Sequence, residues 1–125
     1  MTDDKWMLIV DDEPKIRLLM KRYLNLKGYT VMLAKNGEEG FQLFSQHSQR
    51  FELCIVDLNL PDISGDVLLQ KIKKIKPEIR IGLVSGDAKT RLAEKSIELQ
   101  PNFTLSKPFS LHHLMEYIRI KKYFQ

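Results

Sequence analysis

Residues that can bind a cation or hold a phosphoryl group follow four short apolar runs of the chain. They are an acid pair, a third acid, a hydroxyl and a lysine: Asp11-Asp12, Asp57, Ser85 and Lys107. Carboxylate oxygens are preferred ligands of Mg²⁺, which needs only one or two of them beside water and substrate oxygens. A hydroxyl and an ammonium group suit the phosphoryl oxygens opposite such an ion. Gathered at one place, these side chains would form a site for Mg²⁺ and phosphoryl transfer.

Asp57 is the best candidate for the residue that accepts the phosphoryl group. It directly follows a continuous apolar run and precedes a loop of turn-forming residues, Leu58 to Gly65. An aspartate can attack phosphorus and form an acyl phosphate. The other expected metal ligands are the acid pair and one backbone carbonyl: Asp11, Asp12 and that of Asn59. Gly86 should leave room for the incoming group beside the hydroxyl of Ser85.

Five apolar runs predict the strands that must position these side chains. Runs without polar alternation are typical of strands buried on both faces, and here they cover residues 6–10, 30–34, 53–56, 81–84 and 103–106. Helical patterns lie between them, with Pro14 in the first turn of one and a stop at Gly28. Asn36 and Glu39 have the spacing of a capping box.

The three remaining helices are predicted from their apolar stripes. One ends before Pro77, a polar one spans residues 89–98, and the last follows Ser110. The residues expected to be buried are, in order, Leu68, Ile72 and Ile75; Leu92, Ala93 and Ile97; Leu111, Leu114, Met115 and Ile118. Strict alternation of strands and helices implies a parallel sheet with helices on both faces. Ligands of such sheets bind beyond the carboxyl ends of the strands, where the polar residues fall.

Composition indicates one globular domain over residues 1–125. The chain is 43% hydrophobic and 29% charged, which argues against disorder. Its one cysteine, Cys54, lies inside a predicted strand and suits inert packing in a reducing compartment. The longest apolar run is far shorter than the roughly 20 residues that span a bilayer. With an acidic start instead of a basic signal sequence, these features favour the cytoplasm and no membrane association.

The net charge of +4 lies in the second half of the chain. Residues 1–62 carry 8 basic and 10 acidic side chains, whereas residues 63–125 carry 12 and 6. From residue 89 onward the balance is 7 to 3. The basic residues are scattered singly, without interleaved aromatics, so nucleic acid is the poorest fit. His112 and His113 are adjacent on a helix and face different ways, which disfavours a shared metal site.

Four motifs together resemble the receiver domain of two-component response regulators, the chemotaxis-protein-Y-like fold. They are Asp11-Asp12, Asp57 to Gly65, Ser85-Gly86 and Lys107-Pro108-Phe109. The resemblance covers nearly the whole chain and implies a flavodoxin-like (βα)5 α/β fold, doubly wound, with five parallel strands in the order 2-1-3-4-5. Because the last predicted helix reaches the terminus, we expect a single receiver domain without an effector domain, either a stand-alone regulator or a receiver excised from a longer protein.

The resemblance assigns a role to each motif residue. Asp57 would take a phosphoryl group from a histidine kinase or phosphotransfer protein, with Mg²⁺ held by Asp12, Asp57 and the carbonyl of Asn59. Asp11 belongs to the same acidic pair, Lys107 would contact the phosphoryl group, and Ser85 would hydrogen-bond it. The Lys107-Pro108 peptide is expected to be cis. Receivers also remove their own phosphoryl group, tuned near Asn59 and Asp87, and are not turnover enzymes.

Two positions depart from the family pattern. The aromatic switch residue expected three positions before the lysine is Thr104, and its neighbour Phe103 should point to the opposite sheet face. The segment before that strand has Gln100-Pro101 where Gly-Ala is common. The first departure leaves open a receiver-like binding module that no longer switches. A hydrolase of the haloacid dehalogenase type is a further alternative, although it needs a second aspartate where Asn59 stands.

Output is expected through residues 89–125. Their basic excess predicts an acidic protein partner or a contact between two copies of the chain. The residues expected to carry it are Lys89, Arg91, Lys95 and Arg119.

Overall fold

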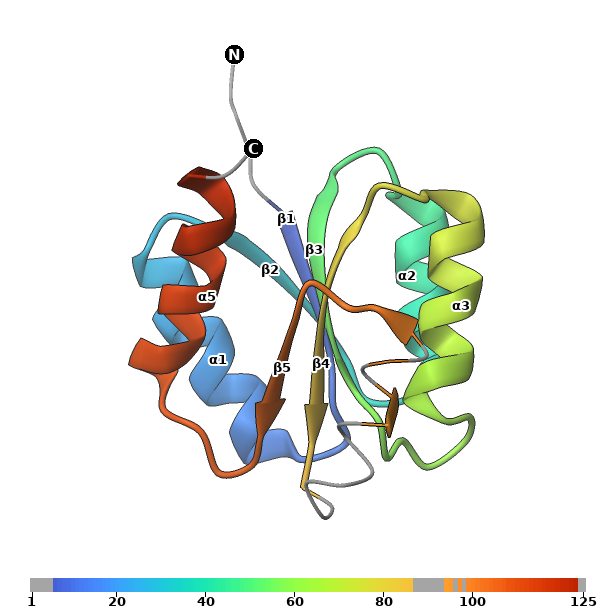
Figure 1. Ribbon diagram of the computed structural model, residues 1–125, viewed down its shortest axis with the longest axis horizontal. Coiled ribbons are helices and arrows are strands. Elements are labelled where there is room, and N and C mark those ends of the chain that lie inside the picture. The colour runs from blue at the N-terminus through green and yellow to red at the C-terminus, as the bar shows by residue number, and fades with distance from the viewer. Residues whose placement is uncertain (1–5, 87–93, 96, 98, 124–125) are drawn as a thin grey trace.

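One parallel sheet forms the centre of the computed structural model, which describes residues 6–86, 94, 95, 97 and 99–123. Its strands are β1 (Trp6–Val10), β2 (Thr30–Ala34), β3 (Phe51–Asp57), β4 (Arg80–Ser85) and β5 (Phe103–Ser106). They pair in the order β2-β1-β3-β4-β5, each parallel to its neighbour (Figure 1). The predicted fold class and strand order are confirmed.

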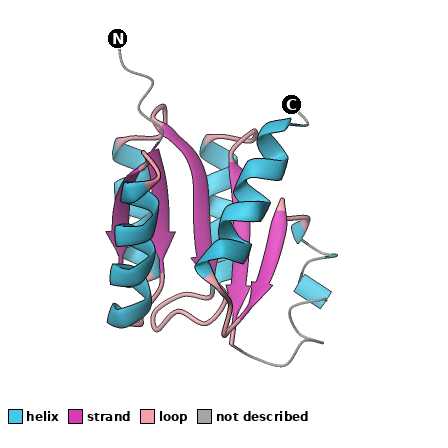
Figure 2. Cartoon of the chain, turned by 90° about the vertical axis from the view of Figure 1, so that its left-hand side faces the viewer, coloured by secondary structure: helices cyan, strands magenta, loops and turns pink. Residues whose placement is uncertain are grey.

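Helices cover both faces of the sheet. They are α1 (Pro14–Leu26), α2 (Gly37–Gln46), α3 (Gly65–Ile75) and α5 (Leu111–Tyr123). α1 and α5 lie on one face and α2 and α3 on the other (Figure 1), and Figure 2 shows the layers from the side of α1 and α5. Most of the helix predicted at 89–98, including Leu92 and Ala93, lies outside the described residues, but Glu94, Lys95, Ile97 and Leu99 are helical.

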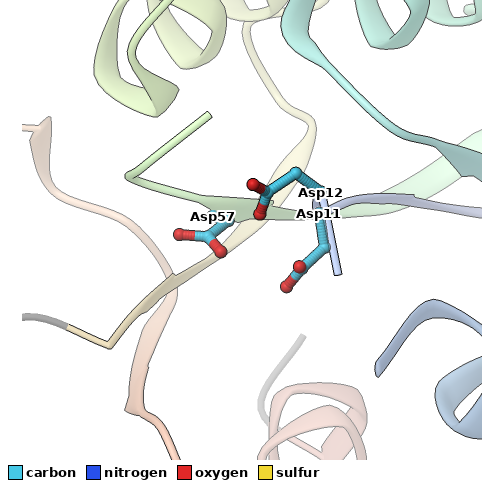
Figure 3. Close-up of side chains that lie close together, drawn as sticks. All are labelled: Asp11, Asp12 and Asp57. Carbon is cyan, nitrogen blue, oxygen red and sulfur yellow. The ribbon is translucent and has the colours of Figure 1, made fainter. Parts of the chain in front are cut away.

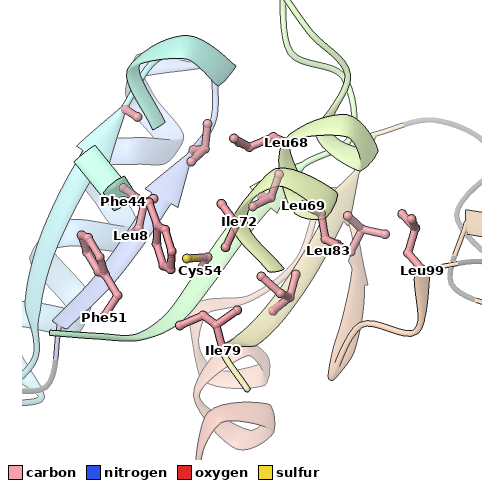
Figure 4. Packing of buried hydrophobic residues seen from close by; sticks show 14 of the residues in the cluster. Leu8, Phe44, Phe51, Cys54, Leu68, Leu69, Ile72, Ile79, Leu83 and Leu99 are labelled. Carbon is pink, nitrogen blue, oxygen red and sulfur yellow. The ribbon is translucent and has the colours of Figure 1, made fainter. Parts of the chain in front are cut away.

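Alternation along the strands builds a core on each side of the sheet. On the α2 and α3 side, Leu8, Cys54 and Val56 pack with residues such as Leu68 and Ile72 (Figure 4). The other side is formed by a separate set that includes Met7, Ile9, Ile55, Leu114, Met115 and Ile118. Cys54 is a free, buried thiol whose pKa is raised by burial, as expected of inert packing.

Local signals at the helix ends match the prediction. The side chain of Asn36 accepts a hydrogen bond from the Glu39 N–H at 2.8 Å, and the Lys35 N–H donates to Glu39 Oε1 at 2.9 Å. The first bond is that of the predicted capping box, whereas the return bond to Glu39 comes from Lys35, one residue before the cap, and not from Asn36 itself. Pro14 begins α1, and Gly28 follows the helix with a φ of 96°, which favours glycine.

Two residues predicted to be buried are exposed. Ile75 is 42% exposed because it is the last residue of α3, at the edge of the covered face, and Ile97 is 79% exposed. β3 and β4 are also longer than predicted. Phe51 pairs with Trp6 and Asp57 with Val84 at the ends of β3, and Arg80 pairs with Leu53 and Ser85 with Ser106 at the ends of β4. Within the described residues, no helix is both long and apolar enough to cross a membrane.

Candidate functional site

Three carboxylates meet at the carboxyl ends of β1 and β3. Val10 at the end of β1 pairs with Val56, so the residues that follow, Asp11 and Asp57, lie side by side. With Asp12 they each offer an oxygen, and these atoms all lie within 4.8 Å of one another (Figure 3). Asp11 and Asp57 are buried, whereas Asp12 is exposed. The strand-end prediction for these three acids is confirmed.

Lys107 joins the cluster from the end of β5. Its Nζ lies 2.8 Å from Asp57 Oδ2 and 2.9 Å from Asp11 Oδ2, and it also contacts Glu13 Oε1. Burial by itself lowers the pKa of Lys107, but hydrogen bonds to Asp57, Glu13 and Asp11 outweigh it, so the pKa is raised. The ammonium group therefore remains charged and offsets part of the negative charge of the site.

The loop after β1 is held by its own hydrogen bonds. The Glu13 N–H donates to Asp11 Oδ1 at 2.9 Å, and Arg17 Nη1 donates to the Asp11 carbonyl at 2.6 Å. Burial raises the pKa of Asp11 and the charge of Asp57 adds to this rise, which exceeds the lowering by hydrogen bonds from Glu13 and Lys107. Because the Asp11 and Asp57 carboxylates lie close together, a cation bound between them would relieve their mutual repulsion.

The other predicted site residues lie at the same edge. Ser85 ends β4 fully buried, and its carbonyl accepts a hydrogen bond from the Lys107 N–H at 2.8 Å. The Asn59 N–H donates to Asp57 Oδ1 at 2.9 Å, which places the start of the β3–α3 loop beside Asp57. A Cβ atom on Gly86 would lie 3.8 Å from Lys107 Cδ, an ordinary van der Waals distance, so there is room for it beside Ser85.

The region predicted to carry the switch is described in part. The Lys107-Pro108 peptide is cis, as expected. Thr104 is half-buried, whereas Phe103 is buried on the opposite face of β5 and stacks on Tyr117 with ring centroids 5.2 Å apart. The predicted opposite orientation of these neighbours is confirmed. Asp87 lies outside the described residues.

Sequence reasoning missed three residues at or beside the site. Glu13 contacts Lys107, Arg17 fixes the Asp11 carbonyl, and Asp62 binds the start of α2. Glu13 directly follows the acid pair, which is the only sequence signal for it. Asp62 contacts Gly37, which lies 25 positions earlier in the chain, and local sequence patterns do not indicate pairs so far apart.

One residue of the predicted basic output surface is paired with an acid of the same molecule. Lys95 forms an ion pair with Asp66 at 3.0 Å, and its side chain is 24% exposed. Its charge is therefore engaged within the molecule. Arg119 is exposed, and Lys89 and Arg91 lie outside the described residues.

Comparison with known proteins places this geometry in a family. The family model for the response regulator receiver domain matches residues 7–119. Sensor protein EvgS of Escherichia coli K12 is 34% identical over 112 residues, which are 90% of this chain but 9% of EvgS. Sporulation initiation phosphotransferase F of Bacillus subtilis is 28% identical over 94% of this chain and 91% of its own length. The chain thus spans a small part of some relatives and nearly all of another.

Solved structures agree with this assignment. A CheY-like response regulator receiver domain protein from Methanospirillum hungatei has a TM-score of 0.84 and 32% identity, covering 94% of this chain and 93% of its own. Response regulator protein TrrA of Thermotoga maritima, in complex with Mg(2+)-BeF, has a TM-score of 0.80 and 33% identity, covering 92% and 96%. The chain belongs to the response regulator receiver domain family of two-component signalling.

Proposed function

We propose that Asp57 accepts a phosphoryl group from a phosphohistidine of a sensor histidine kinase or a histidine phosphotransfer protein. The observation that carries the proposal is the position of the Asp57 carboxylate, between the Lys107 ammonium group and the acid pair Asp11-Asp12. Family membership supports the reaction class, because receiver domains work with kinases and phosphotransfer proteins.

The transfer exchanges one bond to phosphorus for another. An Asp57 carboxylate oxygen attacks the phosphorus, the bond from phosphorus to the imidazole nitrogen breaks, and that nitrogen keeps the bonding electrons and takes a proton. The Asn59 N–H and the Lys107 ammonium group hold the Asp57 carboxylate in place through its two oxygens. Lys107 then neutralises charge on the transferred oxygens, and Ser85 would donate a hydrogen bond to one of them.

The donor set fits Mg²⁺. Oxygens of Asp11, Asp12 and Asp57 lie within 4.8 Å of one another, and hard oxygen ligands are what this ion prefers. Asp12, Asp57 and the Asn59 carbonyl would hold it, with Asp11 acting directly or through a water molecule. When bound, the ion supplies charge neutralisation for the phosphoryl oxygens and the attacking carboxylate.

Attack of water on the aspartyl phosphate would end the signal. The bond between phosphorus and the Asp57 oxygen breaks, inorganic phosphate leaves, and the carboxylate is restored. The protein then acts on its own phosphoryl group and not as a turnover enzyme on external substrates.

Signal output is proposed through residues 89–125, toward an acidic protein partner or a second copy of the chain. Arg119 supports this surface because it is exposed, whereas Lys95 is paired with Asp66. A second candidate, a receiver-like binding module without a switch, is favoured by Thr104, which replaces the aromatic residue, and by Phe103, which is fixed by Tyr117. Backbone NMR spectra that change with beryllofluoride and Mg²⁺ support switching, and identical spectra support the second candidate.

Phosphotransfer to the purified protein tests the proposed reaction. We expect acetyl phosphate or a phosphohistidine donor to add one phosphoryl group in the presence of Mg²⁺, and chelation of Mg²⁺ to prevent it. Asp57→Ala should remain unmodified. Equal labelling of wild type and Asp57→Ala would overturn the assignment of the phosphoacceptor.

A further inference from the structure

The N-terminus of α2 is capped by a residue from a distant loop. Asp62 Oδ1 accepts a hydrogen bond from the Gly37 N–H and Oδ2 accepts one from the Glu38 N–H, both at 2.8 Å. The next N–H, of Glu39, is bound by Asn36 within the same segment. First-turn N–H groups have no partner inside their own helix, and a carboxylate is a strong acceptor for them. Asp62 thus links the β3–α3 loop to α2.

Direct packing reinforces this link. A Cβ atom on Gly37 would lie 2.2 Å from Ile63 Cγ1 and 3.2 Å from Asp62 Oδ1. The loop therefore lies against the first residue of α2, at a distance that glycine allows. Both oxygens of one side chain and the neighbouring Ile63 side chain hold the two segments together.

The same loop begins at the phosphoacceptor. The Leu58 N–H donates to the Val84 carbonyl at 2.8 Å, the Asn59 N–H donates to Asp57 Oδ1 at 2.9 Å, and the Gly65 N–H donates to the Leu58 carbonyl at 2.9 Å. These bonds fix the two ends of the loop. Asp62 fixes the stretch between them, three residues beyond Asn59.

We propose that Asp62 is a positioning residue for the phosphoacceptor site, which holds the β3–α3 loop against α2 so that the Asn59 carbonyl is presented to Mg²⁺. This inference rests on the proposed function, in which that carbonyl is a metal ligand. A backbone carbonyl is placed only by its loop, since it has no side chain of its own to adjust. Loss of the anchor would therefore weaken metal binding without removing any ligand.

A purely structural cap makes a different prediction, and Asn36 provides the matched control. Asn36→Ala removes a cap from the same helix end but leaves the β3–α3 loop anchored. Asp62→Asn keeps the size of the side chain but replaces one accepting oxygen with an amide group that cannot accept. Because Asp62 is exposed, the variant keeps the core intact.

Calorimetric titration with Mg²⁺, together with chemical unfolding of each variant, tests the proposal. We expect Asp62→Asn and Asp62→Ala to bind Mg²⁺ on the order of tenfold more weakly than wild type. Asn36→Ala should lose stability yet bind Mg²⁺ as wild type does. The rate of phosphorylation by acetyl phosphate at limiting Mg²⁺ should fall in parallel for the Asp62 variants only.

Two negative outcomes have different meanings. Mg²⁺ affinity equal to wild type in both Asp62 variants would overturn the positioning role and leave the proposed function standing. Failure of wild type to bind Mg²⁺ or to accept a phosphoryl group would overturn the proposed function and this inference together.

Discussion

At the scale of single residues, Lys107 determines the electrostatics of the site. It is the shared partner of Asp11, Glu13 and Asp57, and its side chain is only 13% exposed. The ammonium group lies beside the buried carboxylates of Asp11 and Asp57 and offsets part of the cost of removing water from them. In the proposed reaction the same group would contact the oxygens of a phosphoryl group on Asp57.

Replacement of Lys107 by methionine should slow phosphorylation of Asp57. Removal of one preorganised charge from a transferred group costs on the order of a hundredfold in rate. The measurement is the rate of phosphorylation by acetyl phosphate at saturating Mg²⁺. Lys95→Met is a suitable control, because that lysine is paired with Asp66 instead. Equal rates for Lys107→Met and wild type would contradict this role.

Residue types at strand ends predicted much of the site. Asp11, Asp12, Asp57, Ser85 and Lys107 each follow or end a strand, and parallel topology then brings them to one edge. Glu13 was not predicted, because its partner Lys107 lies 94 positions away and the contact depends on side-chain reach. Strand order predicts which strand ends lie side by side, but not which carboxylate oxygens Lys107 contacts.

At the scale of elements, β4 and β5 are fitted to each other by one glycine. Gly82 pairs with Phe103, and a Cβ atom on Gly82 would lie 2.3 Å from the Phe103 ring. The ring occupies the space that a side chain would need and stacks on Tyr117 of α5. This packing commits the aromatic residue of β5 to the α5 side of the sheet.

Gly82→Ala should destabilise the fold by overpacking. Displacement of a buried ring by an added methyl group costs about 1–3 kcal/mol, which urea unfolding would measure as a lower midpoint. Gly86→Ala is the control, because the added Cβ would meet Lys107 Cδ only at 3.8 Å. Equal stability of Gly82→Ala and wild type would show that the ring moves freely.

The cap of α2 by Asp62 should make stability depend on pH. Slight burial raises the pKa of Asp62, but hydrogen bonds from Glu38 and Gly37 outweigh it and hold the pKa below 3.8. The unfolded chain then binds the proton more readily, so this contribution is complete above pH 3.8 and is lost as the pH falls through the folded value.

The pH dependence can be isolated with two variants. The difference in free energy of unfolding between wild type and Asp62→Asn should be constant near neutral pH and shrink in acid. The difference in free energy of unfolding between wild type and Asn36→Ala should not shrink in acid on account of the lost cap, because the Asn36 amide does not titrate in this range. A difference for Asp62→Asn that is independent of pH would contradict the charged cap.

Element positions were largely predictable, but their limits were not. β2 and β5 have the predicted bounds because turn residues flank them, whereas β3 gains residues at both ends through pairing with its neighbours. Ile75 and Ile97 fit apolar stripes and are nevertheless exposed. Helical spacing gives the direction of a side chain, and the extent of the covering sheet decides its burial.

At the scale of the whole molecule, charge is segregated. The acid cluster lies at the carboxyl edge of the sheet, while the basic excess lies in the second half of the sequence. The overall charge balance was predictable from composition. Pairing of Lys95 with Asp66 was not, because it depends on how the segment that carries Lys95 lies beside α3.

Binding of Mg²⁺ at the acid cluster should stabilise the whole fold. A ligand that binds only the folded state adds about 1.4 kcal/mol to the free energy of unfolding at about ten times its dissociation constant. Thermal unfolding with and without MgCl₂ would show this as a higher midpoint. Asp12→Asn should reduce the effect. An equal rise in that variant would place the ion elsewhere.

The phosphoacceptor can be located directly by borohydride reduction of the phosphorylated protein. Reduction converts an aspartyl phosphate to homoserine, and peptide mass spectrometry then identifies its position. We expect homoserine at position 57 only when Mg²⁺ and a phosphoryl donor are both supplied. Homoserine at another aspartate, or at none in a sample that carries the phosphoryl group, would contradict the central claim.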